Sequence, residues 1–84
     1  MALSEFRAGV YEHYKGGQYL VLGIARCDET GEPLVVYVRL YSRPGGIPMT
    51  VRSLESFLAV VQHNGETVPR FQWLGTHQPD LDQS

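Results

Sequence analysis

The amino-acid sequence predicts a small, mainly β fold: an SH3-like barrel or roll of about five antiparallel strands with one short helix or 3₁₀ turn. Short stretches rich in valine, tyrosine, leucine and isoleucine recur along the chain, and glycine or proline separates them. Only residues 54–61 place apolar side chains at helical spacing. Because the chain has 84 residues, we expect one domain over residues 1–75 and a flexible C-terminal tail over residues 76–84.

The first two expected strands form a hairpin. Residues 10–14 and 18–27 are joined by a glycine pair at 16–17, which readily adopts the positive φ angles of a two-residue hairpin loop. With that loop, Tyr14 would lie opposite Tyr19 and form a cross-strand aromatic pair.

The third expected strand follows an acidic loop, CDETGEP, and has the clearest alternation in the chain. One face would carry Leu34, Val36, Val38 and Leu40, and the other Val35, Tyr37, Arg39 and Tyr41. The first set is wholly aliphatic, so we expect it to face the core, with the second set facing outward. On this interpretation, Val36→Ala destabilises the fold more than Val35→Ala.

The remaining elements are short. A strand is expected at 49–52, followed by a helical turn over 53–60 that begins at a serine N-cap and places Phe57 in the core. An Asn-Gly turn at 64–65 then precedes a last strand over 66–74, which a proline restricts to an edge or a bulge.

Composition and charge restrict the kinds of partner and location that we expect. Seven basic and nine acidic side chains give a net charge of −2, so nucleic acid is a possible partner but not the favoured one. The single cysteine, Cys27, cannot form an internal disulfide, and no apolar run approaches membrane-spanning length. We therefore expect a cytoplasmic protein without membrane association. The histidines are scattered and no phosphate-binding glycine motif is present, so we expect no metal and no cofactor.

The candidate binding residues are polar and aromatic side chains predicted to share an outer face. They are Tyr11, His13 and Lys15 on the first strand, Tyr37, Arg39 and Tyr41 on the third, and Arg70 near the last. Aromatic rings beside arginines suit the binding of peptides or single-stranded nucleic acid. Alternatively, the same side chains only cover a solvated surface, and Arg70 forms an ion pair with Glu12, Glu29 or Glu55.

Catalysis has one candidate pair, a Cys27 nucleophile with His13 as its base. No orienting third group stands at a recognisable spacing, and no glycine-rich oxyanion loop is present. The leading prediction is therefore a non-catalytic binding or accessory module that recognises a protein segment. A nucleic-acid-binding barrel is the alternative, and a small enzyme that uses His13 and Cys27 comes third.

The motifs YEHYKGGQYLVLGIA, DETGEPLVVYVRLY, RSLESFL and VPRF occur in this order over roughly residues 9–71. Their order resembles a small bacterial domain-of-unknown-function family, the one numbered sixteen fifty-three. The resemblance implies an SH3-like roll in a short bacterial protein, without an assigned activity. Two departures stand out: Cys27 occupies a position where the family often has histidine, and Met49-Thr50 stands where it often has an aromatic residue.

Overall fold

The computed structural model describes residues 6–76. They form seven strands and one helix in the order β1 (Gly9–His13), β2 (Gln18–Arg26), β3 (Pro33–Arg39), β4 (Met49–Ser53), α1 (Leu54–Leu58), β5 (Val60–His63), β6 (Glu66–Pro69) and β7 (Phe71–Gly75). No helix within this part of the chain is long and apolar enough to cross a membrane. All but the first residue of the expected tail at 76–84 lies outside the described residues.

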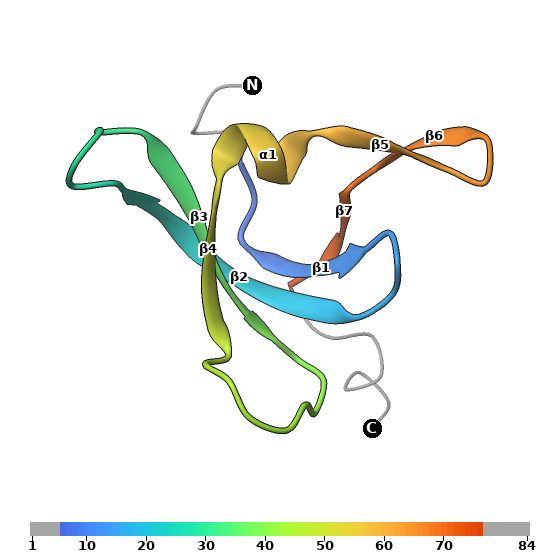
Figure 1. Ribbon diagram of the computed structural model, residues 1–84, viewed down its shortest axis with the longest axis horizontal. Coiled ribbons are helices and arrows are strands. Elements are labelled where there is room, and N and C mark those ends of the chain that lie inside the picture. The colour runs from blue at the N-terminus through green and yellow to red at the C-terminus, as the bar shows by residue number, and fades with distance from the viewer. Residues whose placement is uncertain (1–5, 77–84) are drawn as a thin grey trace.

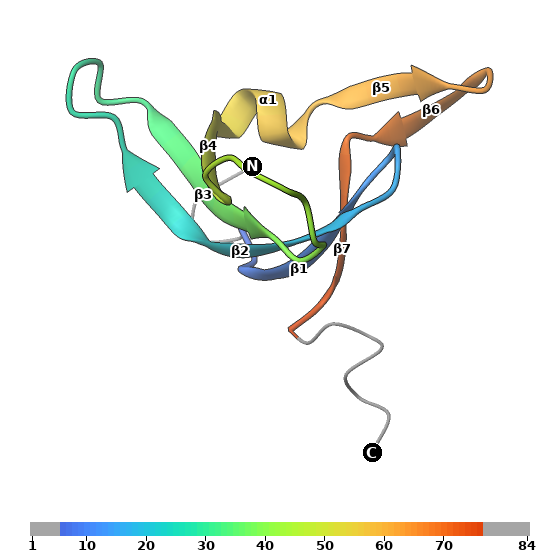
Figure 2. The same cartoon turned by 60° about the horizontal axis from the view of Figure 1, so that its bottom comes forward.

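Five strands form one antiparallel sheet in the order β4-β3-β2-β1-β7, and β5 and β6 form a separate hairpin that projects away from it (Figure 1). The sheet curves beneath α1, so that the helix lies across its concave face (Figure 2). The edge strands β4 and β7 are not hydrogen-bonded to each other, so the sheet is an open roll. The prediction of a mainly β fold with a five-stranded antiparallel sheet and one short helix is confirmed.

The helix begins where its serine cap predicts. Ser53 Oγ accepts a hydrogen bond from the backbone N–H of Ser56 at 3.2 Å, which satisfies one of the free amides of the first turn. The helix ends after one turn because Ala59 takes an extended conformation. Its short length is sufficient to place Leu54 and Phe57 in the core.

The register of the first hairpin differs from the prediction. Tyr11, and not Tyr14, lies opposite Tyr19. The loop between the two strands is four residues long and is closed by the Gly16 N–H, which donates to the His13 carbonyl at 2.8 Å. The prediction of a two-residue loop was therefore wrong. Gly16 and Gly17 do adopt positive φ angles, but they are the last two residues of a four-residue loop. The observed pairing is shifted by three residues from the predicted one. Because side chains alternate between the two faces of a strand, a shift by an odd number changes which side chains of the two strands share a face.

The predicted faces of β3 are also reversed. Val35 and Tyr37 are 0% and 4% exposed, whereas Leu34, Val36 and Val38 are half-buried on the opposite face. Leu40 lies beyond the end of β3. Only Phe57 among the expected core residues is in the core, and its ring stacks on Phe71 at 4.2 Å between centroids.

The physical reason for the reversal is that β3 is apolar on both faces, so alternation alone cannot say which face α1 covers. Large rings decide it, because aromatic side chains bury a large apolar area each, and Tyr11, Tyr37, Phe57 and Phe71 all lie in the core. The opposite face has no covering element among residues 6–76, and Leu22, Met49 and Val51 are each about half exposed there.

Candidate functional site

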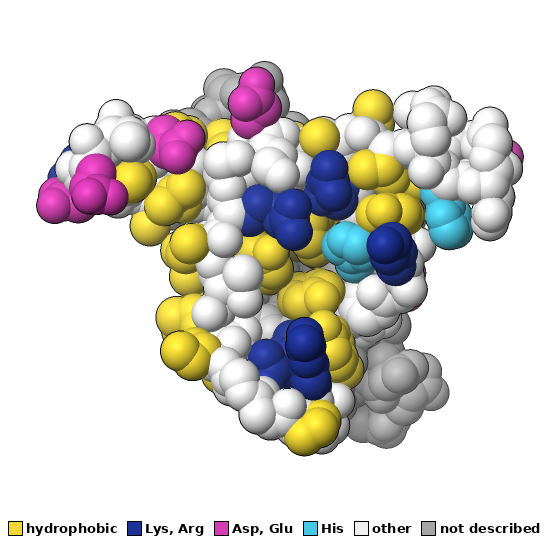
Figure 3. All heavy atoms as spheres, viewed as in Figure 1, with side chains coloured by type: hydrophobic (Ala, Val, Ile, Leu, Met, Phe, Trp, Pro, Cys, Tyr) yellow, Lys and Arg dark blue, Asp and Glu magenta, His cyan; other side chains and the backbone are white. Residues whose placement is uncertain are grey.

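The aromatic core reaches the surface at one end of the concave face, beyond α1. The rings of Tyr19, Tyr37 and Phe71 contact one another edge to face, with centroids 5.4 to 5.8 Å apart. We call these three rings the aromatic floor. Figure 3 shows hydrophobic side chains at the bottom of a hollow in the middle of this face.

Basic side chains surround the floor, and we call them the cationic rim. The rim consists of His13, Lys15, Arg39, Arg52 and Arg70. They come from β1, the β1–β2 turn, β3, β4 and the junction of β6 with β7, so only the folded chain brings them together. In Figure 3, Lys, Arg and His side chains gather around the hollow, and the acidic side chains lie at the periphery of this view.

Arg52 and Arg70 are both held by one residue of α1. Arg52 donates from Nη1 to Ser56 Oγ at 3.2 Å and from Nε to the Tyr37 hydroxyl at 3.3 Å. Arg70 donates from Nε to the Ser56 carbonyl at 3.1 Å. The guanidinium of Arg52 also lies over the Phe71 ring, 5.6 Å from its centroid. Sequence reasoning missed Arg52 because its place depends on strand pairing: Arg52 lies in β4 opposite Val35, which belongs to the buried face of β3.

Neither guanidinium pairs with a carboxylate of residues 6–76. The one ion pair among residues 6–76 joins Arg26 to Asp28, at 3.8 Å on an exposed turn. The expected alternative for Arg70, an ion pair with Glu12, Glu29 or Glu55, is therefore not formed. The rim keeps its positive charge for whatever approaches from solvent.

His13 lies between these arginines and the first turn. Its ring contacts Phe71 and Tyr14, with centroids 4.9 and 4.7 Å away. Its Nδ1 accepts a hydrogen bond from the Lys15 backbone N–H at 3.2 Å, so the proton of the neutral ring is on Nε2. Burial, and then the charges of Arg52, Arg70 and Lys15, lower the pKa of His13. The lowered pKa favours the neutral imidazole, so the positive charge of the cationic rim comes from its lysine and its three arginines.

Arg39 and Tyr41 shape the opposite side of the hollow. Arg39 donates to the carbonyls of Arg43, Gly45 and Ile47 and so holds the β3–β4 loop in place. The hydroxyls of Tyr41 and Tyr19 are 2.9 Å apart. Burial, and then this hydrogen bond, raise the pKa of Tyr19 to about 12, while the same bond lowers the pKa of Tyr41.

Not every predicted residue lies at this surface. The outward placement of Tyr11 and Tyr37 was wrong, because the reversed faces put both rings in the core. Tyr11 is 7% exposed and its hydroxyl donates to the Arg7 carbonyl at 2.6 Å. The Tyr37 ring is a buried part of the aromatic floor, and its hydroxyl accepts a hydrogen bond from Arg52. The structure brings together His13, Lys15, Arg39, Tyr41 and Arg70 of the predicted set. It adds Tyr19, Arg52 and Phe71.

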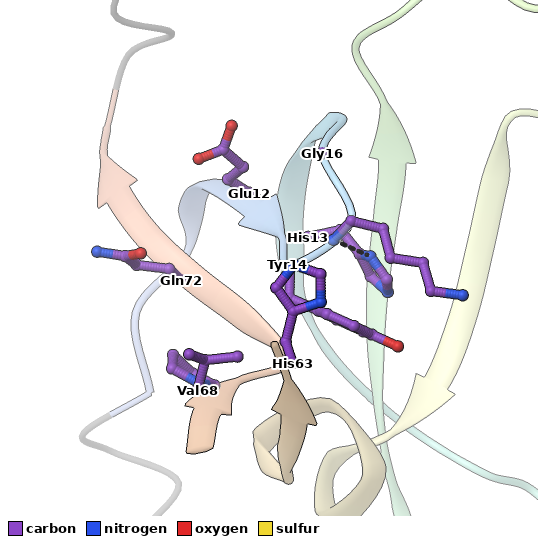
Figure 4. A pocket seen from close by; sticks show the side chains of 9 residues that line it. Glu12, His13, Tyr14, Gly16, His63, Val68 and Gln72 are labelled. Atoms are coloured by element: carbon purple, nitrogen blue, oxygen red, sulfur yellow. Dashed lines mark hydrogen bonds between the residues drawn. The ribbon is translucent and has the colours of Figure 1, made fainter. Parts of the chain in front are cut away.

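A cavity of about 480 Å³ lies behind the rim, between the β1–β2 turn and the β5–β6 hairpin. Figure 4 shows His13, Tyr14 and His63 close together on one side of it, with Glu12 and Gln72 pointing away from the two imidazoles. Tyr14 and His63 meet edge to face at 5.4 Å. Within residues 6–76, no three His, Cys, Asp or Glu side chains are grouped closely enough to hold a metal ion.

The catalytic pair considered from the sequence does not assemble. Cys27 lies in the turn after β2, and His13 lies just before the other end of that strand. The nine residues of β2 span about 30 Å at the usual rise of a strand, so the thiol and the imidazole cannot exchange a proton. A hydrogen bond with the Thr30 side chain, followed by backbone hydrogen bonds from Thr30 and Glu29, lowers the pKa of the Cys27 thiol.

Fold and site together define a class: a small antiparallel β-roll with one helix across its concave face and a cationic, aromatic surface beside that helix. The chain belongs to the family described as Protein of unknown function (DUF1653), which matches residues 9–73. The resemblance noted in the sequence is thereby confirmed. A crystal structure of a member of this family from Bordetella bronchiseptica is similar to the chain, with a TM-score of 0.87 and 49% identity. The match covers 93% of this chain and 99% of the Bordetella chain. No curated protein matches.

Proposed function

We propose that the protein is a non-catalytic binding module that recognises an acidic segment of another protein at the cationic rim and the aromatic floor. The observation that carries this proposal is that side chains from four parts of the chain place positive charge around the half-buried Tyr19 ring and the exposed Tyr41 ring, and none of these cations pairs with a carboxylate within residues 6–76.

Physical chemistry supports an anionic, partly apolar ligand. Like charges held near one another in the folded chain repel, and an approaching anion relieves that repulsion. The half-buried Tyr19 ring and the exposed Tyr41 ring offer apolar area, and tyrosine and arginine are residue types that dominate binding energy at protein interfaces. A segment that combines acidic and apolar side chains satisfies both parts of the surface.

A second candidate is single-stranded nucleic acid, and the exposed Tyr41 ring beside arginines favours it, because bases stack on such rings. Overall charge argues against it. The whole chain has a net charge of −2, and phosphate neutralisation is the main source of affinity for nucleic acids.

Fluorescence anisotropy with three labelled ligands tests the proposal: a peptide of alternating glutamate and tyrosine, its glutamine analogue, and a single-stranded oligonucleotide. We expect the acidic peptide to bind, the glutamine analogue to bind much more weakly, and added salt to weaken binding. Lys15→Gln and Tyr41→Ala should each reduce the affinity. Arg26→Gln removes the same charge from the distant turn and should not.

Equal binding of the acidic peptide and its glutamine analogue would contradict the proposal, as would an equal loss for Lys15→Gln and Arg26→Gln. Tighter binding of the oligonucleotide than of the acidic peptide would select the nucleic-acid candidate instead.

A further inference from the structure

Arg52 and Arg70 are fixed in position by bonds that leave part of each guanidinium free. Ser56 and the Tyr37 hydroxyl use Nη1 and Nε of Arg52, and the Ser56 carbonyl uses Nε of Arg70. Within residues 6–76, no acceptor forms a hydrogen bond with Nη2 of Arg52 or with either Nη of Arg70. Three terminal nitrogens therefore have hydrogens to donate, on two side chains whose orientation is already set.

The imidazole of His13 faces the same place. The charged groups that act on it are Arg52 from β4, Arg70 from the β6–β7 junction and Lys15 from the β1–β2 turn, and its ring contacts are Tyr14 and Phe71. Two further titratable groups, His63 from β5 and Glu12 from β1, line the cavity beside it, and the Glu12 carboxylate points away from the imidazole. No carboxylate pairs with any of the three cations in the described part of the chain. With Nδ1 occupied by a backbone amide, the proton on Nε2 is the one that His13 can donate.

We propose that Arg52, Arg70 and His13 form a binding site for an oxyanion, a carboxylate or phosphoryl group carried by the bound segment. A guanidinium presents paired N–H groups that match two oxygens of such an anion, and fixed donors lose little entropy when they bind it. The site deepens the proposed function and rests on it for the source of the anion. It explains why a chain this small holds two like charges against one serine.

A purely structural role for the two arginines is the competing explanation, since both tie α1 to the sheet. Such a role predicts that their loss destabilises the fold, and it predicts no response of the wild-type protein to anions. The measurement that separates the two explanations is therefore made on the wild-type chain.

The test is an NMR titration of the isotope-labelled protein with sodium sulfate, compared with sodium chloride at the same ionic strength. Sulfate stays a dianion across the pH range in which histidine titrates, so a pH dependence of binding reports the protein. We expect saturable shifts of the guanidinium signals of Arg52 and Arg70 and of the His13 ring, and none for Arg26. The bound anion should also favour protonated His13, so sulfate binds more tightly as the pH falls through the histidine range.

Shifts that do not saturate, or that are as large at Arg26 as at Arg52 and Arg70, would overturn the site. Two variants give a second, independent measurement. Arg70→Gln should weaken sulfate binding roughly tenfold or more, as expected for the loss of a charged hydrogen bond, whereas Arg26→Gln should not. His13→Gln should remove the pH dependence. If Arg70→Gln fails to fold, the wild-type titration decides alone.

Peptides then identify the source of the anion and separate this proposal from the function. A phosphoserine peptide and a glutamate peptide of otherwise equal sequence show which group the site prefers. Sulfate bound at the three residues with neither peptide bound would keep the oxyanion site and refute the protein-segment function. A peptide bound equally by the wild type and a folded Arg70→Gln would keep the function and refute the site.

Discussion

Val35 and Val36 are adjacent on β3 and chemically identical, so replacing each with alanine compares the two faces of the sheet directly. Val35 is 0% exposed beneath α1, whereas Val36 is half-buried on the uncovered face. Val35→Ala removes two fully buried methyl groups and leaves a cavity, which costs about 2–3 kcal/mol. Val36→Ala removes two groups that water already reaches, which costs about 1 kcal/mol or less. Both changes lose the same β-branch, so strand propensity cancels in the comparison.

Urea unfolding followed by far-UV circular dichroism measures both free energies. In a domain of this size the Val35→Ala loss should lower Tm by about 10–20 °C, against a few degrees for Val36→Ala. Equal losses, or a larger loss for Val36→Ala, would refute the argument that ring packing on α1 chooses the buried face of β3. A larger loss for Val36→Ala would instead support the expectation that the aliphatic face of β3 is the buried one.

Three further predictions concern single groups. Ser53→Ala removes the N-cap hydrogen bond of α1 and should cost about 1 kcal/mol in urea unfolding, and Ser53→Asp should retain most of that stability. Thr30→Val removes a hydrogen bond that stabilises the thiolate, so the pKa of Cys27 should rise and its alkylation by iodoacetamide at neutral pH should slow. Because the folded pKa of His13 is lowered, the unfolded chain binds its proton more tightly. The free energy of unfolding should then be constant above about pH 6.5 and fall as the pH decreases toward the folded pKa, and His13→Gln should abolish this fall. A profile that is unchanged in His13→Gln would assign the titration to another group.

The parts of the fold that depend on local chemistry could be predicted from the sequence. Turn residues and a serine cap located β1 to β4 and α1 to within a few residues, because these signals act over one turn of chain. The strand β5 was not predicted, and the single last strand expected over 66–74 is divided into β6 and β7, which belong to different sheets. The register of the first hairpin and the buried face of β3 could not be predicted from such local signals. A four-residue loop and a two-residue loop use the same glycine pair, and a strand that is apolar on both sides fits either orientation.

The candidate site likewise has residues that could be predicted from the sequence and residues that could not. The residue types of His13, Lys15 and Arg70 were enough to propose them as binding residues. Basic side chains near tyrosines indicate a possible binding surface even when the register of the strands is not known. Arg52 and Tyr19 could be found only with the register, because their place depends on which strand neighbours which and on where the helix crosses the sheet. Their hydrogen bonds and ring contacts join segments that are up to 52 residues apart along the chain, as for Tyr19 and Phe71.

The short helix links the core to the site. Within one turn, Phe57 points into the core and stacks on Phe71, while Ser56 holds Arg52 and Arg70 at the surface through its hydroxyl and its carbonyl. A helix of five residues has little stability of its own, so its position depends on the burial of Phe57. The positions of the two guanidinium groups therefore depend on the packing of the core, and a change at Phe57 should disorder the cationic rim as well as lower the stability. The fixed geometry that an oxyanion site needs is thus supplied by the same contacts that keep this small sheet folded.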